Sequence, residues 1–184
     1  MELNFRNIET ERLLIRDIQL TDAQDIFDYR ADPRVYIYQC WRPRNIDDVI
    51  EFINNNILSA KDISSHWHNF AVIQKLENKL IGDLAMNFYD SQNMNLEIGY
   101  TISPQYQGCG YAIEGVKALM NFVFNNLNIH RIIASMDPRN IKSENLAKRL
   151  GMRLEAHHVK NIKSDNEWLD TLVYAILKEE FVIN

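Results

Sequence analysis

The stretch QGCGYA, residues 107–112, places two of the chain's six glycines within six positions. It follows an alternating segment, 94–102, that predicts a strand, and it precedes apolar residues at helical spacing. The first turn of a helix presents free N–H groups and the positive end of the helix dipole, and both attract anions. Glycines at 108 and 110 would let a phosphate reach the backbone and would accept a positive φ. We therefore interpret QGCGYA as a phosphate-binding loop.

Two other phosphate motifs fit this stretch poorly. A P-loop requires Lys followed by Ser or Thr after its last glycine, and the chain contains no such Gly-Lys-Ser or Gly-Lys-Thr. A dinucleotide fingerprint requires a third glycine three positions after the second, but Gly115 comes two positions late and His130 stands where the acidic residue of the fingerprint would be expected. A glycine loop that only caps the following helix, with no ligand, stays open as the alternative.

Composition limits the class of protein. The chain has 184 residues, of which 46% are hydrophobic and 24% charged, so we expect one domain, 1–184, with its own core. No apolar run approaches the roughly 18 residues of a membrane span, and the N-terminus lacks the pattern of a signal peptide. A cytoplasmic protein without a membrane partner is expected. The net charge of −5 argues against nucleic acid as a partner, and the two cysteines are expected to be free thiols.

Periodicity predicts a mixed sheet flanked by helices, an α/β (α+β) fold. Seven strands are expected, at 12–18, 67–75, 79–88, 94–102, 130–136, 152–160 and 167–178. Four helices are expected, near 21–31, 46–60, 111–127 and 143–150. Thr21 and Gln24 form a capping-box pattern for the first helix, and Asp32-Pro33 should close it.

Longer stretches carry a family resemblance. The pattern Gln107-x-x-Gly110-x-Ala112 is similar to the Q/R-x-x-G-x-G/A signature of the GNAT superfamily of acyl-CoA-dependent N-acetyltransferases. ETERLLIRDIQLTDAQDIFDY, LEIGYTISPQYQGCGYAIEG and NIKSENLAKRLGM resemble successive segments of its ribosomal-protein-alanine N-acetyltransferase branch. Near the end, Trp168, Asp170 and Tyr174 match that branch's W-x-D-x-x-x-Y strand. The resemblance covers nearly the whole chain.

The resemblance implies a single-domain GNAT-like fold with a mixed, mostly antiparallel seven-stranded sheet and about four helices. It implies acetyl-CoA as co-substrate, with the pantetheine arm between the splayed strands 94–102 and 130–136. The residues implied to contact it are Thr101, Ile102, Gln107, Gly108, Cys109, Gly110, Tyr111, Ala112 and Asn140.

The implied catalytic residues are Glu97 and Ser143. Glu97 would act as the base, directly or through water; the alternative is a glutamate that orients a loop or pairs with Arg or Lys. A bulge at Gly99 would aim a backbone N–H at the thioester carbonyl. Many relatives hold a tyrosine acid where this chain has Ala147, and the branch's N-x-x-S pattern makes Ser143 the replacement. The alternative for Ser143 is a helix N-cap.

The resulting hypothesis is an acetyl-CoA-dependent N-acetyltransferase that acts on a primary amine by direct attack in a ternary complex. A protein N-terminal α-amine and a small amine are both open as acceptors. A CoA-binding sensor or scaffold without catalysis is the alternative. No metal is expected, because His66 and His68 share a strand face without an evident third ligand. Analogy with relatives suggests a homodimer.

Overall fold

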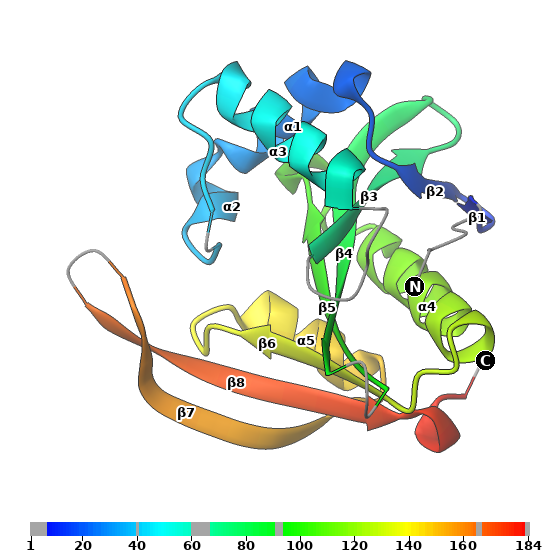
Figure 1. Cartoon of the computed structure of the whole chain (residues 1–184), viewed down its shortest axis with the longest axis vertical. Helices are drawn as coiled ribbons and strands as arrows, with labels where there is room; N and C mark the ends of the chain where they lie inside the picture. The colour runs from blue at the N-terminus through cyan, green and yellow to red at the C-terminus, as the bar shows by residue number, and fades with distance from the viewer. Residues whose placement is uncertain (1–6, 40, 60–66, 91–93, 165–166, 183–184) are drawn as a thin grey trace.

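A computed structural model describes residues 7–39, 41–59, 67–90, 94–164 and 167–182. Its strands form one sheet in the order β1-β2-β3-β4-β5-β6-β8-β7 (Figure 1). Every neighbouring pair is antiparallel except β5 and β6, which are parallel. The strands are β1 (Ile8–Glu9), β2 (Leu13–Asp17), β3 (Trp67–Gln74), β4 (Lys79–Asp90), β5 (Asn95–Ile102), β6 (Arg131–Met136), β7 (Arg153–Lys163) and β8 (Trp168–Leu177).

Helices cover both faces of this sheet (Figure 1). One face packs against α4 and α5, and the other packs against α1 and α3, so each face has its own apolar cluster. The α-helices are α1 (Ala23–Arg30), α2 (Pro33–Tyr36), α3 (Ile46–Ser59), α4 (Tyr111–Asn126) and α5 (Ile141–Arg149). Within the described part of the chain, none of these helices has the length and apolar character that crossing a membrane requires.

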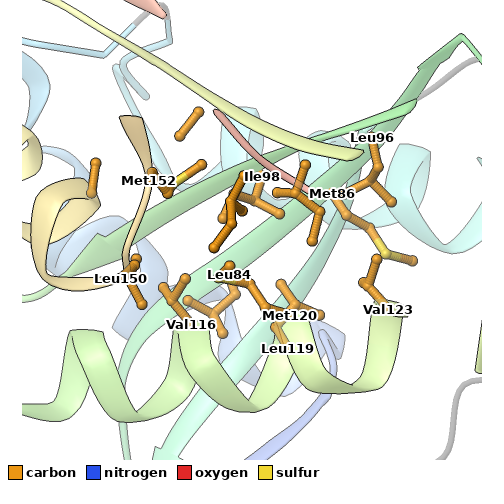
Figure 2. Packing of buried hydrophobic residues seen from close by; sticks show 14 of the residues in the cluster. Leu84, Met86, Leu96, Ile98, Val116, Leu119, Met120, Val123, Leu150 and Met152 are labelled. Atoms are coloured by element: carbon orange, nitrogen blue, oxygen red, sulfur yellow. The ribbon is translucent and has the colours of Figure 1, made fainter. Parts of the chain in front are cut away.

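The larger cluster explains why α4 forms where the spacing predicts it. Its buried residues repeat every three to four positions and face the central strands (Figure 2). Leu119, Met120 and Val123 are fully buried against strand residues that include Leu84 and Leu96. Each such side chain contributes roughly 1.5–3 kcal/mol by leaving water. This packing holds the N-terminus of α4 in place beside the start of β4 and the end of β5.

The structure confirms the fold class and corrects its details. The sheet has eight strands rather than seven, because the two-residue strand β1 pairs with β2. Asp32-Pro33 does close the first helix, but Asp32 also caps the short helix α2, in which Pro33 is the first residue. The predicted Thr21 and Gln24 capping box is wrong. Asp22 instead accepts a hydrogen bond from the Gln19 amide at 2.8 Å, ahead of α1.

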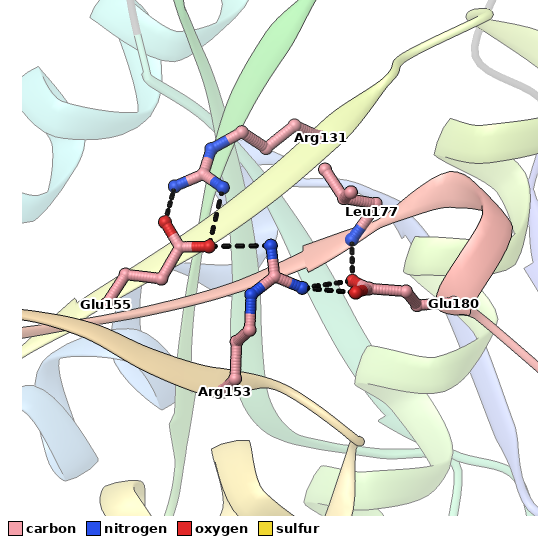
Figure 3. A network of polar contacts seen from close by, with 5 residues as sticks. All are labelled: Arg131, Arg153, Glu155, Leu177 and Glu180. Carbon is pink, nitrogen blue, oxygen red and sulfur yellow. Dashed lines mark hydrogen bonds and ion pairs between the residues drawn. The ribbon is translucent and has the colours of Figure 1, made fainter.

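A charged network fixes the far edge of the sheet (Figure 3). Arg131 of β6 pairs with Glu155 of β7, and Arg153 joins Glu155 at 2.7 Å. Arg153 also pairs with Glu180, whose carboxylate accepts a hydrogen bond from the Leu177 amide at 2.8 Å. Side-chain bonds therefore connect β6, β7 and the turn after β8, although most of β7 is exposed.

Candidate active site

The glycine loop has the backbone geometry that an anion site requires. Gly108 and Gly110 have φ values of +81° and +84°, which L side chains rarely adopt. Gly110 is the N-cap of α4, and no side chain caps the helix there. The first helical bond runs from the Glu114 amide to the Gly110 carbonyl at 3.2 Å. The N–H groups of Tyr111 and Ala112 thus stand in the first turn, where a helix supplies no acceptor.

Arg12, which lies just before β2, bonds to both the glycine loop and the first turn of α4. Its guanidinium donates to the Cys109 carbonyl at 3.0 Å and to Glu114 at 2.7 Å, and it lies 4.6 Å from the Tyr111 ring centre. Glu114 also accepts from Thr10 at 2.6 Å. Burial raises the pKa of Glu114, but these hydrogen bonds and the charge of Arg12 outweigh it and lower the pKa. Hydrogen bonds and an ion pair between the residues just before β2 and the first turn of α4 therefore hold the loop in place.

Gln107 connects the loop to two further elements. Its amide nitrogen donates to the Ile102 carbonyl at 2.9 Å, and its amide oxygen accepts from Lys142 of α5 at 2.9 Å. The end of β5, the glycine loop and the first turn of α5 are thus joined through one side chain.

β5 and β6 separate next to this loop (Figure 1). Their parallel pairing runs from Asn95 to Glu97, which lies opposite Ile133, and it goes no further. β5 continues to Ile102 while paired only with β4. One edge of this five-residue stretch is therefore open to another extended chain, and the glycine loop begins five residues after it.

A glycine in β4 lets β4 pack closely against this stretch of β5 from the other side. A Cβ at Gly82 would lie 2.2 Å from the Thr101 carbonyl oxygen, closer than any side chain tolerates, and 3.0 Å from the Ile102 Cα. The predicted bulge at Gly99 is wrong, because the β4–β5 register runs without a shift from 97 to 102. The close neighbour of Gly99 is the Trp67 ring, which a Cβ at that position would meet at 3.4 Å.

Two polar residues stand beside the open edge, on opposite faces of the sheet. Glu97 is partly exposed and makes no ion pair with the described residues. Ser143 is the third residue of α5, and its hydroxyl lies 2.9 Å from the hydroxyl of Tyr100. Tyr100 packs against the α4–α5 cluster, and strand alternation directs Glu97 to the α1–α3 face.

The α1–α3 face carries a buried charged group beside a hollow. Asp83, opposite Thr101 in the β4–β5 register, pairs with Arg30 at 2.6 Å and accepts from the Tyr29 hydroxyl. Burial lowers the pKa of Arg30, but the charge of Asp83 outweighs it and raises the pKa. Arg30 lies 5.5 Å from the ring of Trp41, which stacks on Phe52. These rings border a hollow of about 370 Å³, whose lining is Trp41, Arg42, Arg44, Asp48, Glu51, Phe52 and Asn55.

Comparison with known proteins identifies this arrangement. Residues 12–153 match the family described as "Acetyltransferase (GNAT) domain". The chain belongs to the GNAT acetyltransferase family. It is 37% identical to the uncharacterized N-acetyltransferase YnaD of Bacillus subtilis, over 95% of this chain and 99% of that protein. It is 25% identical to the [ribosomal protein uS5]-alanine N-acetyltransferase of Escherichia coli, over 92% of this chain and 89% of that protein.

A solved structure supports the same membership. The crystal structure of a GNAT-family acetyltransferase from Bacillus anthracis superposes with a TM-score of 0.86 and 35% identity, covering 95% of this chain and all of that one. GNAT enzymes use acetyl-CoA, so the predictions of an acyltransferase and of this donor class are confirmed at the level of the family. The alternative of a CoA-binding module without catalysis finds no support in these relatives.

The predicted GNAT site residues fall into one region, although their individual roles stay predictions. Thr101 and Ile102 lie on the open stretch of β5, and the six residues 107–112 form the loop at α4. Asn140 caps α5 by accepting from the Ser143 amide at 3.2 Å. The N-cap alternative for Ser143 is therefore wrong. Ala147 of α5 is fully buried and its side chain is a methyl group, so this position adds no polar group to the site.

Sequence reasoning missed Arg12 and Tyr100, whose partners lie far away in the chain. The expectation that the chain binds no metal stays a prediction. Among the described residues no three His, Cys, Asp or Glu side chains could hold a metal ion, whereas His66 lies outside them. Cys109 is a free, exposed thiol, and Cys40 likewise lies outside the described residues.

Proposed function

We propose that this chain transfers the acetyl group of acetyl-CoA to a primary amine by direct attack in a ternary complex. The observation that carries the proposal is the separation of β5 from β6 at Glu97, beside the glycine loop. Backbone N–H groups of residues 111 and 112 would bind the diphosphate of CoA, and the open edge at Thr101 and Ile102 would bind its extended arm. Asn140 would contact the same arm.

Glu97 would accept the proton of the attacking amine. It stands at the point of separation, and no charged partner among the described residues occupies its carboxylate. An α-amino group with a pKa of about 8 is already partly neutral at pH 7, whereas a lysine amine near 10.4 is almost entirely protonated. An N-terminal amine therefore depends less on Glu97 for the removal of its proton than a lysine amine does.

Ser143 would donate a proton to the departing thiolate from the opposite face. With the base on the α1–α3 face and the acid on the α4–α5 face, the amine would enter on one side and sulfur would leave on the other. Free N–H groups along the open edge of β5 would stabilise the oxyanion, and one such donor typically contributes about 10²–10³ in rate.

The acceptor is either a protein N-terminal α-amine or a small cationic amine. The relative named for ribosomal protein uS5 favours the first. The net charge of −5 favours a cationic acceptor of either kind. A homodimer and a cytoplasmic location stay predictions.

Thiol release from acetyl-CoA tests this proposal across a panel of peptides with free N-termini, polyamines and amino acids. We expect turnover with at least one acceptor, and a Glu97→Gln variant should lose about 10²–10⁴ in kcat. Glu179→Gln, an exposed change in the turn after β8, is the matched control and should keep full activity. CoA binding without turnover of any amine would refute the catalytic proposal.

A further inference from the structure

Tyr100 occupies an unusual position for a partly buried tyrosine. It lies on the part of β5 that has no β6 partner, and its ring packs against the cluster under α4 and α5. Its hydroxyl lies 2.9 Å from the Ser143 hydroxyl and 3.2 Å from the Ser143 carbonyl oxygen. One phenol therefore contacts the proposed acid across the open side of β5.

Packing alone explains the ring but not this hydroxyl. A phenylalanine would fill the same space, whereas a half-buried hydroxyl requires a polar partner. Burial raises the pKa of Tyr100, and the bond to Ser143 only partly opposes this. The phenol therefore stays protonated at neutral pH and has a proton to donate.

The location of Tyr100 also bears on which group can protonate the departing thiolate. Ala147 of α5 is buried, and an alanine side chain has no proton to supply. A serine hydroxyl alone would become a strongly basic alkoxide on giving up its proton. A phenol ionises far more readily than a serine hydroxyl, even though burial raises the pKa of Tyr100 above its ordinary value of about 10.

We infer that Tyr100 and Ser143 form a two-hydroxyl relay that protonates the thiolate of CoA as it leaves; this inference rests on the proposed acetyl transfer. When the carbon–sulfur bond breaks, its electron pair goes to sulfur, and the Ser143 hydroxyl gives sulfur its proton. Ser143 takes the Tyr100 proton in the same movement. The tyrosinate regains a proton from solvent after the thiol departs, and the proton lost by the amine goes to Glu97.

The control for this relay is a second tyrosine that contacts the same helix. Tyr174 of β8 donates to Glu144 of α5 at 2.8 Å, so it also joins a strand to the first turns of α5. Tyr174→Phe removes such a bond without touching Ser143. A structural role for Tyr100 predicts that the two tyrosine variants behave alike.

The test measures kcat and KM for acetyl-CoA, together with thermal unfolding, with the best acceptor of the panel. Tyr100→Phe should lower kcat about 100-fold, the lower end of a general-acid contribution, with KM within twofold. Tyr174→Phe should leave kcat within twofold. Tyr100→Phe combined with Ser143→Ala should be no slower than the slower single variant, because both interrupt one proton path.

Three results would overturn the relay. Tyr100→Phe could keep kcat within twofold of the wild type, the double variant could show the product of the two single losses, or Ser143→Thr, which keeps a hydroxyl, could be as slow as Ser143→Ala. If Tyr100→Phe unfolds, the Ser143→Thr and Ser143→Ala pair decides the matter. A wild type without turnover across the panel would instead remove the proposed function itself.

Discussion

The two faces of the central sheet differ in the groups that they offer to a ligand. At the N-terminus of α4, next to the open edge of β5, these groups belong to the backbone: two glycines with positive φ and free amides in the first turn of the helix. On the α1–α3 side they belong to side chains, with Arg30 and Asp83 close to a hollow bordered by Trp41 and Phe52. A site made of backbone depends on a fixed conformation, whereas a hollow made of side chains can be altered by a few substitutions. A common donor and a variable acceptor would suit this division.

The α1–α3 side can be tested by removing one partner of its buried ion pair between Arg30 and Asp83. Asp83→Ala would leave Arg30 buried without a counterion, so we expect the free energy of unfolding to fall by about 3–5 kcal/mol in urea titrations. The double variant Arg30→Met with Asp83→Leu should recover most of this loss, because it removes both charges. If Asp83→Ala alone unfolds at the wild-type urea concentration, the pair does not stabilise this side.

The role of the glycine loop can be tested by substituting Gly110. An aspartate there would be strained at φ +84° and would repel the diphosphate, so CoA affinity measured by calorimetry should fall about 100-fold, ~2.7 kcal/mol. Gly151→Asp is the matched control, since Gly151 has φ +83° at the end of α5, away from the loop. Equal losses of affinity in the two variants would indicate strain rather than a phosphate contact.

The strand edge depends on Gly82. Alanine at this position would collide with the Thr101 carbonyl, so we expect a loss of about 1–3 kcal/mol in stability and weaker CoA binding in the same variant. Gly99→Ala, whose new Cβ would meet Trp67 and Ala85 only at ordinary contact distances, should change both quantities much less. Thermal unfolding with and without CoA measures the two effects, and full CoA affinity in Gly82→Ala would contradict the role of the edge.

We expect the smallest effect from the bonds between Arg12 and Glu114, which should make the stability of the protein depend on pH. Because the pKa of Glu114 is lowered in the folded state, its contribution is complete above the ordinary value of about 4.3 and is lost as the pH falls through the folded value. Glu114→Gln should therefore be less stable than the wild type by about 1 kcal/mol at pH 7, with the difference closing toward pH 3. A constant difference from pH 7 to pH 3 would show that charge at Glu114 is not the cause.

The part of the site made of backbone could be read from the sequence, because glycine spacing and helical periodicity are local signals. The loop 107–112, α4 and the strand before them all form where these signals predict. The missed features are contacts between distant residues, such as Arg12 with Glu114 and Tyr100 with Ser143. No periodicity encodes such pairs.

Two smaller errors have local causes. The sequence pattern assigns the need for a bare backbone to Gly99. Gly82, also a glycine inside a predicted strand, gives the same signal, and it is the position where a Cβ would collide with the Thr101 carbonyl. The two-residue strand β1 is too short to show alternation, and so periodicity predicts a sheet of only seven strands.

The side chain of Gln107, which bonds both to Ile102 and to Lys142, has a kinetic consequence. Occupation of the glycine loop by a diphosphate would restrain Gln107, and through Lys142 it would restrain the turn that carries Ser143. Donor binding would then organise the acid before any amine arrives. For this reason we expect an ordered sequence of substrate addition, with the nucleotide first and the amine second.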